Sequence, residues 1–466
     1  MFKPDVYRQR RNRLVKNTGK GLVLLPGNED ASMNYRANTY HFRQDSTFLY
    51  FFGIDQQGLA GLIDLDENVH MLFGDDAGID DIIWMGPRPS IRSLGEKAGT
   101  DKTMPYKELG KILKQAVDSK REVHYLPPYR EERVLRLENW LGIHHSEVQQ
   151  KASRALIKAV VSQRSVKSDE EIQQIEKAVD IACEMHTTAM KMAMPGVYER
   201  EIAGRVEGIS LSHGNPVSFP VILSVQGQTL HNHYHGNVLK KGQIMVTDAG
   251  SETSMRYSSD ITRSVPVGGK FLQHQKDVYE IVLAALQSSI DSIKPGAPYR
   301  DIHLRSAGII ARGLTDMGLM KGDPEEAVHQ GAHALFFPHG LGHMLGLDAH
   351  DMEDLGEDNV GYDDEIKRSE QFGLAFLRLG RRLQKGFVLT SEPGIYFIPA
   401  LIDKWRDEGK FKDFIDYGKV EPWKNFGGIR IEDDILVTAD GCRVLGRPIP
   451  KTVAEIESTM QQPVSS

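Results

Sequence analysis

The stretch HGLGHMLGLDAHD, residues 339–351, places three histidines and two aspartates among glycines and apolar residues. Imidazole and carboxylate groups are side chains that bind divalent metals and move protons. His339 and His343 have the spacing of the helical motif H-E-x-x-H, but here glycine replaces the glutamate and lowers the helix propensity. We therefore expect a glycine-bent loop that brings these imidazoles close to the backbone.

Four acidic residues stand at the ends of apolar segments that we expect to be strands. Asp248 closes GQIMVTD, Asp260 precedes ITRSVPV, and Glu392 and Glu432 lie in GFVLTSEPGIYFI and GGIRIEDDILV. One such residue is usually solvated or caps a turn. Four of them in apolar strands are costly to bury without partners, and metal ions are a common remedy.

This donor set also indicates the kind of metal. Four carboxylates and one or two imidazoles are rich in oxygen and favour Mn²⁺ and related hard ions, and so many anions need two cations. Strand alternation adds a fifth charged group: if Ile429 and Ile431 face the core, Arg430 and Glu432 project together from the other face. A third histidine cluster, TLHNHYHGN at 229–237, is typical of a solvated loop, although one of its histidines is a candidate for the site.

A repeat within the chain suggests how these residues are positioned. AMPGVYEREIAGRVEGI begins at Ala193 and IKPGAPYRDIHLRSAGI at Ile293, and several residues coincide after a shift of 100. In each copy a long helix is expected to end at Pro-Gly and a second helix to begin soon after. The period is too long for a solenoid, so we expect two related α+β halves with a site in the cleft between them.

The first 160 residues have a different pattern. Short apolar runs such as GLVLLPG, STFLYFFG and LAGLIDL alternate with helical stretches such as YKELGKILKQAVDS, as in an α/β domain. Beyond them, Ser168 and Glu171 form an S-x-x-E capping box ahead of a long amphipathic helix. We predict an N-terminal α/β domain at 1–160 and an α+β domain at 161–466.

Length and composition limit the classes of function. The chain has 466 residues, more than the roughly 250–300 at which one core stops growing, which favours two domains. A net charge of −7 with no Lys/Arg-rich face argues against nucleic acid as a partner. Two cysteines exclude a disulfide framework, and we find no signal peptide and no apolar run of about 18 residues. We expect a cytoplasmic protein with no membrane segment.

Five segments in order, TDAG, SSDITRSVPVGG, HGLGHMLGLDAHD, TSEPGIYFI and GGIRIEDDILVT, resemble the metallopeptidases of the prolidase and aminopeptidase P group. YHFRQDSTFLYFFGID and IIWMG resemble that group's N-terminal domain, so the resemblance covers nearly the whole chain. It implies a pita-bread catalytic domain with pseudo-twofold halves, which agrees with the repeat. It also implies two divalent metals, commonly manganese, and hydrolysis of the bond between an N-terminal residue and proline.

The resemblance implies a role for each candidate residue. Asp248 would bind one metal, Asp260 and Glu432 would bridge both, and His343 and Glu392 would complete the second metal's shell. His231, His339 and His350 would line the substrate pocket, whereas His233 and His235 have no counterpart. Glu392, which touches both metal and nucleophile, would be the general base and then the proton donor to the leaving proline nitrogen.

Two features favour Xaa-Pro dipeptides over longer peptides as substrates. The segment between TSEPGIYFI and GGIRIEDD resembles the long insertion of prolidase-like dipeptidases, and Arg378 lies fourteen residues before Glu392, where those enzymes hold the carboxylate of a dipeptide. Arg381 and Arg382 lie nearby, and a surface arginine is the ordinary interpretation of all three. The alternative is an aminopeptidase P that releases the first residue of longer peptides.

Other members of the pita-bread group are creatinase-like enzymes without metal, or binding modules without activity. They lose several acidic ligands, whereas this chain keeps all five ligands of the set, so we expect an enzyme. The group also suggests a homodimer or homotetramer.

The sequence departs from the group's pattern in two places. Asp248 and Asp260 are twelve residues apart instead of eleven, so we expect the extra residue in the intervening turn or in a bulge. The acidic segment at 352–371 is also longer than usual, and it is either a solvated loop or a lid.

Overall fold

The computed structural model describes residues 1–463 and divides into two compact units. Unit 1 comprises Met1–Arg164 and Met352–Asn359, and unit 2 comprises Ser165–Asp351 and the chain from Val360 onward. Among the described residues, no helix has both the length and the apolar character needed to cross a bilayer.

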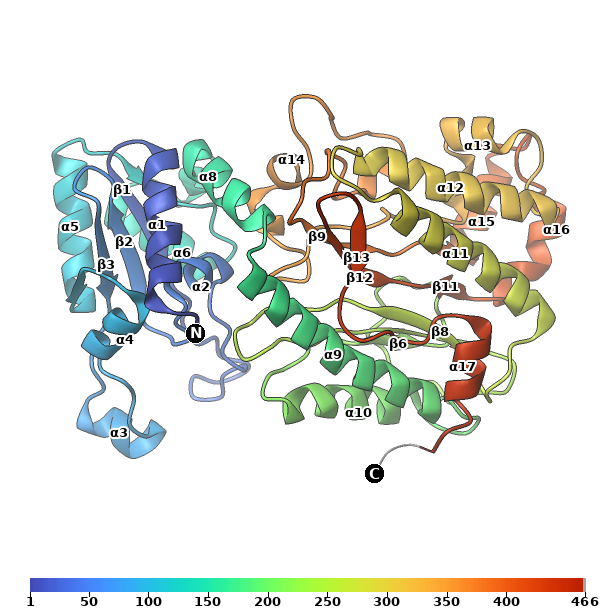
Figure 1. Ribbon diagram of the computed structural model, residues 1–466, viewed down its shortest axis with the longest axis horizontal. Coiled ribbons are helices and arrows are strands. Elements are labelled where there is room, and N and C mark those ends of the chain that lie inside the picture. The colour runs from blue at the N-terminus through green and yellow to red at the C-terminus, as the bar shows by residue number, and fades with distance from the viewer. Residues whose placement is uncertain (464–466) are drawn as a thin grey trace. The chain divides into compact units, whose positions relative to one another are not determined.

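Unit 1 is an α/β domain built on a five-stranded sheet of order β4-β3-β2-β1-β5 (Figure 1). The three central strands are antiparallel, and each edge strand is parallel to its neighbour. Its strands are β1 (Leu22–Pro26), β2 (Ala60–Asp64), β3 (Val69–Phe73), β4 (Lys102–Met104) and β5 (Val123–His124). Its helices are α1 (Pro4–Thr18), α2 (Ser46–Phe52), α3 (Ile79–Met85), α4 (Ile91–Ala98), α5 (Tyr106–Asp118), α6 (Glu131–Leu141), α7 (His145–Val148) and α8 (Arg154–Ser165), of which α8 ends at the first residue of unit 2.

One apolar run of unit 1 is a helix instead of a strand. STFLYFF forms α2, and all seven of its residues are buried. Asp45 caps this helix, since its Oδ1 accepts a hydrogen bond from the N–H of Phe48 at 2.8 Å. A fully buried run shows no polar face, so hydrophobic periodicity cannot distinguish a helix from a strand here.

Unit 2 contains the predicted repeat, because each half has a helix pair and a three-stranded antiparallel sheet. The first half consists of α9 (Asp169–Met192), α10 (Glu199–Ser212) and the sheet of β6 (Ile222–Ser224), β7 (Ile244–Asp248) and β8 (Thr262–Pro266). The second consists of α11 (Gln273–Ser292), α12 (Tyr299–Asp316) and the sheet of β9 (Val388–Ser391), β12 (Asp433–Val437) and β13 (Cys442–Val444). Figure 1 shows the two helix pairs on opposite sides of the strands of this unit.

The repeat is visible at single residues. Helix α9 ends at Met192 and α11 at Ser292, and the helices that follow begin at Glu199 and Tyr299. Gly196 and Gly296 have φ values of 93° and 84°, which side chains other than glycine rarely adopt, so the turn between the helices depends on glycine in both copies. The two related α+β halves were predicted correctly.

The remaining elements of unit 2 complete the second half and the chain end. They are α13 (Pro324–Gln330), η1 (Ala332–Leu335), α14 (Glu357–Val360), η3 (Leu374–Phe376), β10 (Gly394–Tyr396), α15 (Pro399–Asp407), α16 (Tyr417–Val420), η4 (Glu421–Asn425), β11 (Gly428–Arg430) and α17 (Val453–Thr459), with α14 running out of unit 1. Strands β10 and β11 pair antiparallel. Helices α15, α16 and η4 lie in the long insertion that precedes β11.

The extra residue between Asp248 and Asp260 lies in a turn, as expected. Asp248 pairs with Thr262 and Glu252 with Ser258, so the register is constant along the hairpin and no bulge is present. The turn is closed by the N–H of Thr253, which donates to the carbonyl of Tyr257 at 2.9 Å, and it contains Arg256 with φ of 67°. Asp260 is therefore not turned to the wrong face.

The acidic segment at 352–371 is not simply a solvated loop. Met352–Asn359 groups with unit 1 and contains the short helix η2 (Glu353–Leu355). Several apolar side chains along the segment are buried: Met352, Leu355, Val360, Tyr362 and Ile366.

Candidate metal centre

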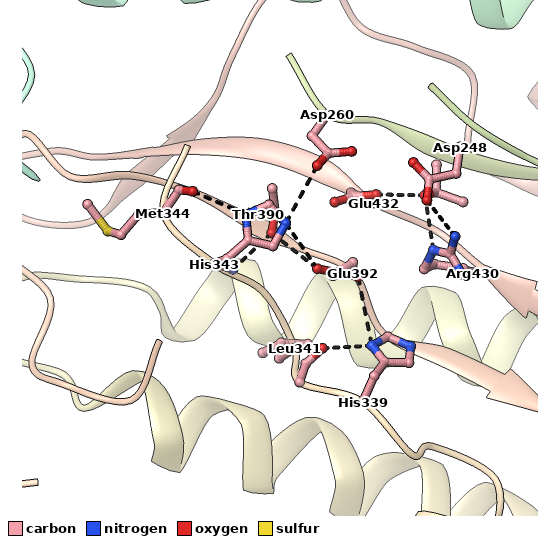
Figure 2. Close-up of polar contacts among 12 residues, drawn as sticks. Asp248, Asp260, His339, Leu341, His343, Met344, Thr390, Glu392, Arg430 and Glu432 are labelled. Atoms are coloured by element: carbon pink, nitrogen blue, oxygen red, sulfur yellow. Dashed lines mark hydrogen bonds and ion pairs between the residues drawn. The ribbon is translucent and has the colours of Figure 1, made fainter. Parts of the chain in front are cut away.

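The structure brings the five predicted metal ligands into one region of unit 2. The donor atoms of Asp260, His343 and Glu432 all lie within 4.8 Å of one another. Nε2 of His343 is 3.5 Å from Oδ2 of Asp260 and 3.5 Å from Oε1 of Glu392 (Figure 2). The first half contributes Asp248 and Asp260 from its hairpin. The second half contributes His343 from the glycine-rich loop, Glu392 directly after β9, and Glu432 directly before β12.

The glycine-rich loop is positioned by β9. The N–H of His343 donates to Oγ1 of Thr390 at 3.1 Å, and the N–H of Thr390 donates back to the carbonyl of His343 at 3.0 Å. The N–H of Glu392 donates to the carbonyl of Leu341 at 2.8 Å. A Cβ on Gly342 would lie 2.2 Å from the carbonyl oxygen of Thr390, so glycine is needed for this close approach. The loop therefore contains no helix, as its glycines predicted.

The carboxylates of this cluster perturb one another. Burial raises the pKa of Asp260 well above its usual value, and the charge of Glu432 adds to the effect. Burial also raises the pKa of Glu432 well above its usual value, with Glu392 as the next contributor. Burial raises the pKa of Glu392 to about 7. The protein alone does not compensate the negative charge that it gathers here.

A second observation favours a site for cations. Oδ1 of Asp248 is buried and has no hydrogen-bond partner among the described residues, although such atoms in proteins are normally paired. Its other oxygen, Oδ2, accepts a bond from Nη2 of Arg430 at 2.6 Å. Buried, mutually repelling carboxylates beside one imidazole fit a site for divalent cations, and Asp260, His343 and Glu432 could hold one of them.

Arg430 links the carboxylate cluster to His339. Its Nη1 donates to Oη of Tyr396 at 2.9 Å, and that oxygen is also 2.9 Å from Nε2 of His339. Nδ1 of His339 is 3.8 Å from Oε2 of Glu392. Burial, followed by the charge of Arg430, lowers the pKa of His339 to about 3, so this imidazole is neutral at physiological pH.

The other two predicted histidines also lie near the centre. The ring of His350 is 4.4 Å from that of His343, at an angle of 68° between their planes. His231 is exposed, but partial burial and the charge of Arg430 lower its pKa. His235 bonds instead to the carbonyl of Leu223, at 3.0 Å.

Arg378 acts on the same cluster of residues through its charge. After burial, its guanidinium helps to lower the pKa of His231 and His343, and it opposes the effect of burial that raises the pKa of Glu392. Its two neighbours are engaged elsewhere. Arg381 donates to Oγ of Ser165 at 2.8 Å, and the exposed Arg382 pairs with Glu365.

Sequence reasoning missed four residues of the site. Tyr396 bridges His339 and Arg430, and Thr262 donates to Oε2 of Glu432 at 2.6 Å. Thr390 holds the loop of His343, and Oδ2 of Asp434 accepts from the N–H of Asp260 at 3.0 Å. Alternation could have found Tyr396, since Glu392, Gly394 and Tyr396 are spaced by two.

Comparisons with known proteins agree with this geometry. Residues 173–439 match the model of metallopeptidase family M24, and residues 7–125 match the aminopeptidase P N-terminal domain. The chain is 32% identical to the Xaa-Pro dipeptidase of Homo sapiens over 96% of its length and 91% of the relative. It is 30% identical to the "Probable Xaa-Pro aminopeptidase pepP" of Aspergillus fumigatus over 95% and 93%.

Solved structures give the same result. Aminopeptidase P of E. coli with the inhibitor Pro-Leu superposes with a TM-score of 0.80 at 28% identity, and aminopeptidase PepP of Pseudomonas aeruginosa with 0.81 at 27%. Each comparison covers 98% of both chains. Fold and donor set thus define a metallopeptidase with a pita-bread catalytic domain. The chain belongs to metallopeptidase family M24, whose members use two divalent metals.

Proposed function

We propose that this protein is an exopeptidase that hydrolyses the Xaa-Pro bond of dipeptides, an Xaa-Pro dipeptidase. The observation that carries the proposal is the cluster of buried carboxylates around His343, with the positive charge of Arg378 acting on the same pocket. The relative from Homo sapiens is named for this activity. A solved structure of aminopeptidase P from E. coli contains Pro-Leu, which is consistent with a pocket for proline in this fold.

We propose that Asp248, Asp260, His343, Glu392 and Glu432 hold two divalent metals and that the physiological metal is Mn²⁺. When bound, the two cations polarise the scissile carbonyl and lower the pKa of the attacking water. The purified protein should contain two metals per chain and lose activity in chelator, with Mn²⁺ among the best ions at restoring it. Full turnover by a protein shown to be free of metal would contradict this assignment.

The remaining residues have roles that follow from their positions. Glu392 takes the proton of the attacking water through a carboxylate oxygen and passes it to the leaving proline nitrogen. His339 is neutral and lies between Tyr396 and the carbonyl of Gly340, and it lines the substrate site together with His231 and His350, which contact the substrate near the reacting carbonyl. Arg430 holds Asp248 and Tyr396 in place.

Arg378 distinguishes the two kinds of exopeptidase. In a dipeptide the carboxylate belongs to the residue that follows the scissile bond, so an arginine whose charge acts on His343 and Glu392 is close enough to the site to bind it. A charge-assisted bond of this kind contributes roughly 1.5–3 kcal/mol, or about 10- to 100-fold in affinity. Longer peptides carry their carboxylate elsewhere and do not benefit from the contact.

The test compares Gly-Pro with Gly-Pro-Pro and with longer peptides. The parent should prefer Gly-Pro, and Arg378→Met should raise its KM for Gly-Pro about 10- to 100-fold with a smaller change in kcat, because the contact exists in both the ground state and the transition state. Arg382→Met is the matched control, since Arg382 is exposed and pairs with Glu365. A dipeptide KM that Arg378→Met leaves unchanged would remove the basis for the assignment.

Aminopeptidase P is the second candidate. It is favoured by the fold similarity to two solved enzymes of that name over 98% of the chain. A parent protein that prefers Gly-Pro-Pro and longer peptides to Gly-Pro would establish this alternative.

We also propose that the protein is a homo-oligomer, a dimer or a tetramer. Helix α3 exposes a row of large apolar side chains that a second copy could cover: Ile79, Ile83, Trp84 and Met85, at 70, 67, 83 and 67%. Sedimentation should therefore give a mass that is a multiple of the 52.2 kDa chain. Trp84→Glu should reduce the mass, and a parent that sediments as a single chain would contradict the proposal.

A further inference from the structure

A buried ion pair lies beside the loop that carries His343 and His350. Nζ of Lys167 donates to Oδ2 of Asp351 at 2.9 Å, and each side chain is only 1% exposed. Both residues belong to unit 2, and neither takes part in the mechanism above. Desolvating two charges offsets much of their mutual attraction, so stability alone is a weak reason for such a pair.

Asp351 closes the loop on itself through both its backbone N–H and its carboxylate. The N–H of Asp351 donates to the carbonyl of Met344 at 2.9 Å, and Oδ1 of Asp351 accepts from the N–H of Asp348 at 3.4 Å. Residues 345–351 contain no helix or strand that could hold this shape. The same carboxylate is therefore bonded both to the loop backbone and, through Lys167, to the start of unit 2.

The closed loop sets the distance between two histidines of the site. His343 directly precedes Met344 and His350 directly precedes Asp351, so the bond between Met344 and Asp351 brings the two histidines side by side. Their rings lie 4.4 Å apart. A change in the loop would move His350 relative to His343, which β9 holds independently.

Gly346 provides the space for the ion pair. A Cβ at this position would lie 2.6 Å from Oδ2 of Asp351 and 3.0 Å from Cε of Lys167. The φ of Gly346 is not in the left-handed region, so glycine is needed here for space and not for backbone conformation. The loop is thus fitted closely around the pair.

We propose that Lys167 and Asp351 are positioning residues, which hold His350 in place beside the metal centre during the reaction. The inference rests on the proposed function, in which His350 contacts the substrate. Small displacements of a group that contacts substrate lower the rate strongly, by up to about 100-fold for 1 Å. A pair with only a structural role would change stability and leave the chemistry of folded molecules unaltered.

The first measurement is the kinetics of Asp351→Asn with the metal-loaded enzyme. The amide oxygen still accepts from Asp348, but the charge that holds Lys167 is lost. We expect kcat to fall about 10- to 100-fold, KM to change less than about threefold, and the metal content to remain that of the parent. Asp45→Asn is the control, since it breaks a buried pair with Arg133 in unit 1 and should leave kcat per folded molecule unchanged.

A double-mutant cycle then tests whether Asp351 acts through His350. In a His350→Ala background, Asp351→Asn should cause no further loss of kcat. The same loss in both backgrounds would overturn the proposal. The cycle needs only a peptide that the parent cleaves, so it remains informative if the preference for Xaa-Pro dipeptides proves wrong.

Two further variants keep the proposal testable if Asp351→Asn folds poorly. Gly346→Ala pushes the pair apart without removing a charge, and it should reproduce the loss of kcat. Lys167→Met/Asp351→Leu leaves no unpaired charge and should recover stability. If kcat recovers together with stability in this double variant, the pair is only structural and the proposal fails; we expect kcat to stay low.

Discussion

Asp45 of unit 1 and Asp260 of unit 2 are both buried aspartates, at 9% and 5% exposure, yet their pKa values move in opposite directions. Burial alone would raise the pKa of Asp45, but the Arg133 guanidinium at 2.9 Å and the bond from Phe48 outweigh it and lower this pKa. Burial raises the pKa of Asp260, and the carboxylates around it raise it further. Their chemical surroundings, not their depth, therefore distinguish the two groups.

The same contrast occurs within three consecutive residues. Asp433 is buried, but Arg263 at 2.7 Å and Lys451 overcome the effect of burial and lower its pKa. Glu432 and Asp434 have pKa values well above the usual range, mainly because of burial. Successive side chains of an extended chain point to opposite faces, so Asp433 lies on one side and its neighbours on the other.

This difference shows how the chain separates structural charge from functional charge. Where a carboxylate has a structural role, the protein supplies the cation from its own arginines and lysines. In the carboxylate cluster of unit 2 it supplies Arg430 to Asp248, and in the proposed function divalent cations neutralise the other carboxylates. The folded protein therefore carries a binding site that is unfavourable in the absence of its metals.

Among changes at the carboxylate cluster of unit 2, Glu392→Gln should have the largest effect on activity. The amide cannot accept the proton of the attacking water, so we expect kcat to fall about 10²- to 10⁴-fold. Circular dichroism and thermal unfolding should show an intact fold, because one repelling charge has been removed. A variant that keeps more than a tenth of the parent's kcat would exclude Glu392 as the base.

Among changes at carboxylates that pair with the protein's own cations, Asp45→Asn should have the largest effect on the free energy of unfolding. The asparagine retains the cap of α2 but leaves the Arg133 charge buried without its partner, which typically costs about 3–5 kcal/mol. Urea unfolding measures this loss, while metal content per folded molecule should not change. A stability equal to that of the parent would show that Arg133 finds another partner, and the contrast with Asp260 would weaken.

Much of this arrangement could be predicted from the sequence. The helix pairs follow from Pro-Gly turns 100 residues apart, because the glycines must adopt positive φ. Strand alternation correctly predicted that Arg430 and Glu432 project together, since both contact the hydroxyl of Thr262. The extra residue between Asp248 and Asp260 was predicted to lie in the turn or in a bulge, because a slip in register would have turned a carboxylate away from the site, and it lies in the turn.

Other features had no local signal. The helical state of residues 46–52 depends on the surrounding core and not on a polar face. Thr262, Thr390 and Asp434 act through side chains or backbone groups that come from strands far apart in the sequence, so no spacing indicates them. Lys167 and Asp351 are 184 positions apart. The sequence around each of them therefore gives no sign of the other.

Asp260→Asn should have the opposite sign to Asp45→Asn in the metal-free protein. Removing one charge relieves repulsion among the carboxylates, so the apparent Tm measured in chelator should rise above that of the metal-free parent. With metal present the same variant should bind less metal and lose its stabilisation by ligand. If chelated Asp260→Asn melts below the chelated parent, repulsion is not the dominant effect at the centre.

The smallest expected effect is on the pH dependence of stability, and it concerns a buried histidine that is neutral in the folded protein. His303 of α12 is fully buried, neither ring nitrogen has a hydrogen-bond partner among the described residues, and burial lowers its pKa to about 3, with a further contribution from His333. The unfolded chain binds a proton near pH 6.5 that the folded chain does not, so stability is complete above pH 6.5 and falls as the pH decreases towards 3. At pH 5 the loss is about 2 kcal/mol.

This pH window separates His303 from Asp45, whose contribution to stability is lost only below about pH 4, the usual pKa of an aspartate in an unfolded chain. His303→Leu should therefore reduce the difference in unfolding free energy between pH 7.5 and pH 5 by about 2 kcal/mol, whereas Asp45→Asn should leave that difference unchanged. His329→Leu provides the control, because it removes a histidine that is exposed instead of buried. Urea unfolding at the two pH values measures all three variants. An unchanged pH dependence in His303→Leu would mean that the folded protein accommodates the protonated imidazole, and the contrast between His303 and Asp45 would be lost.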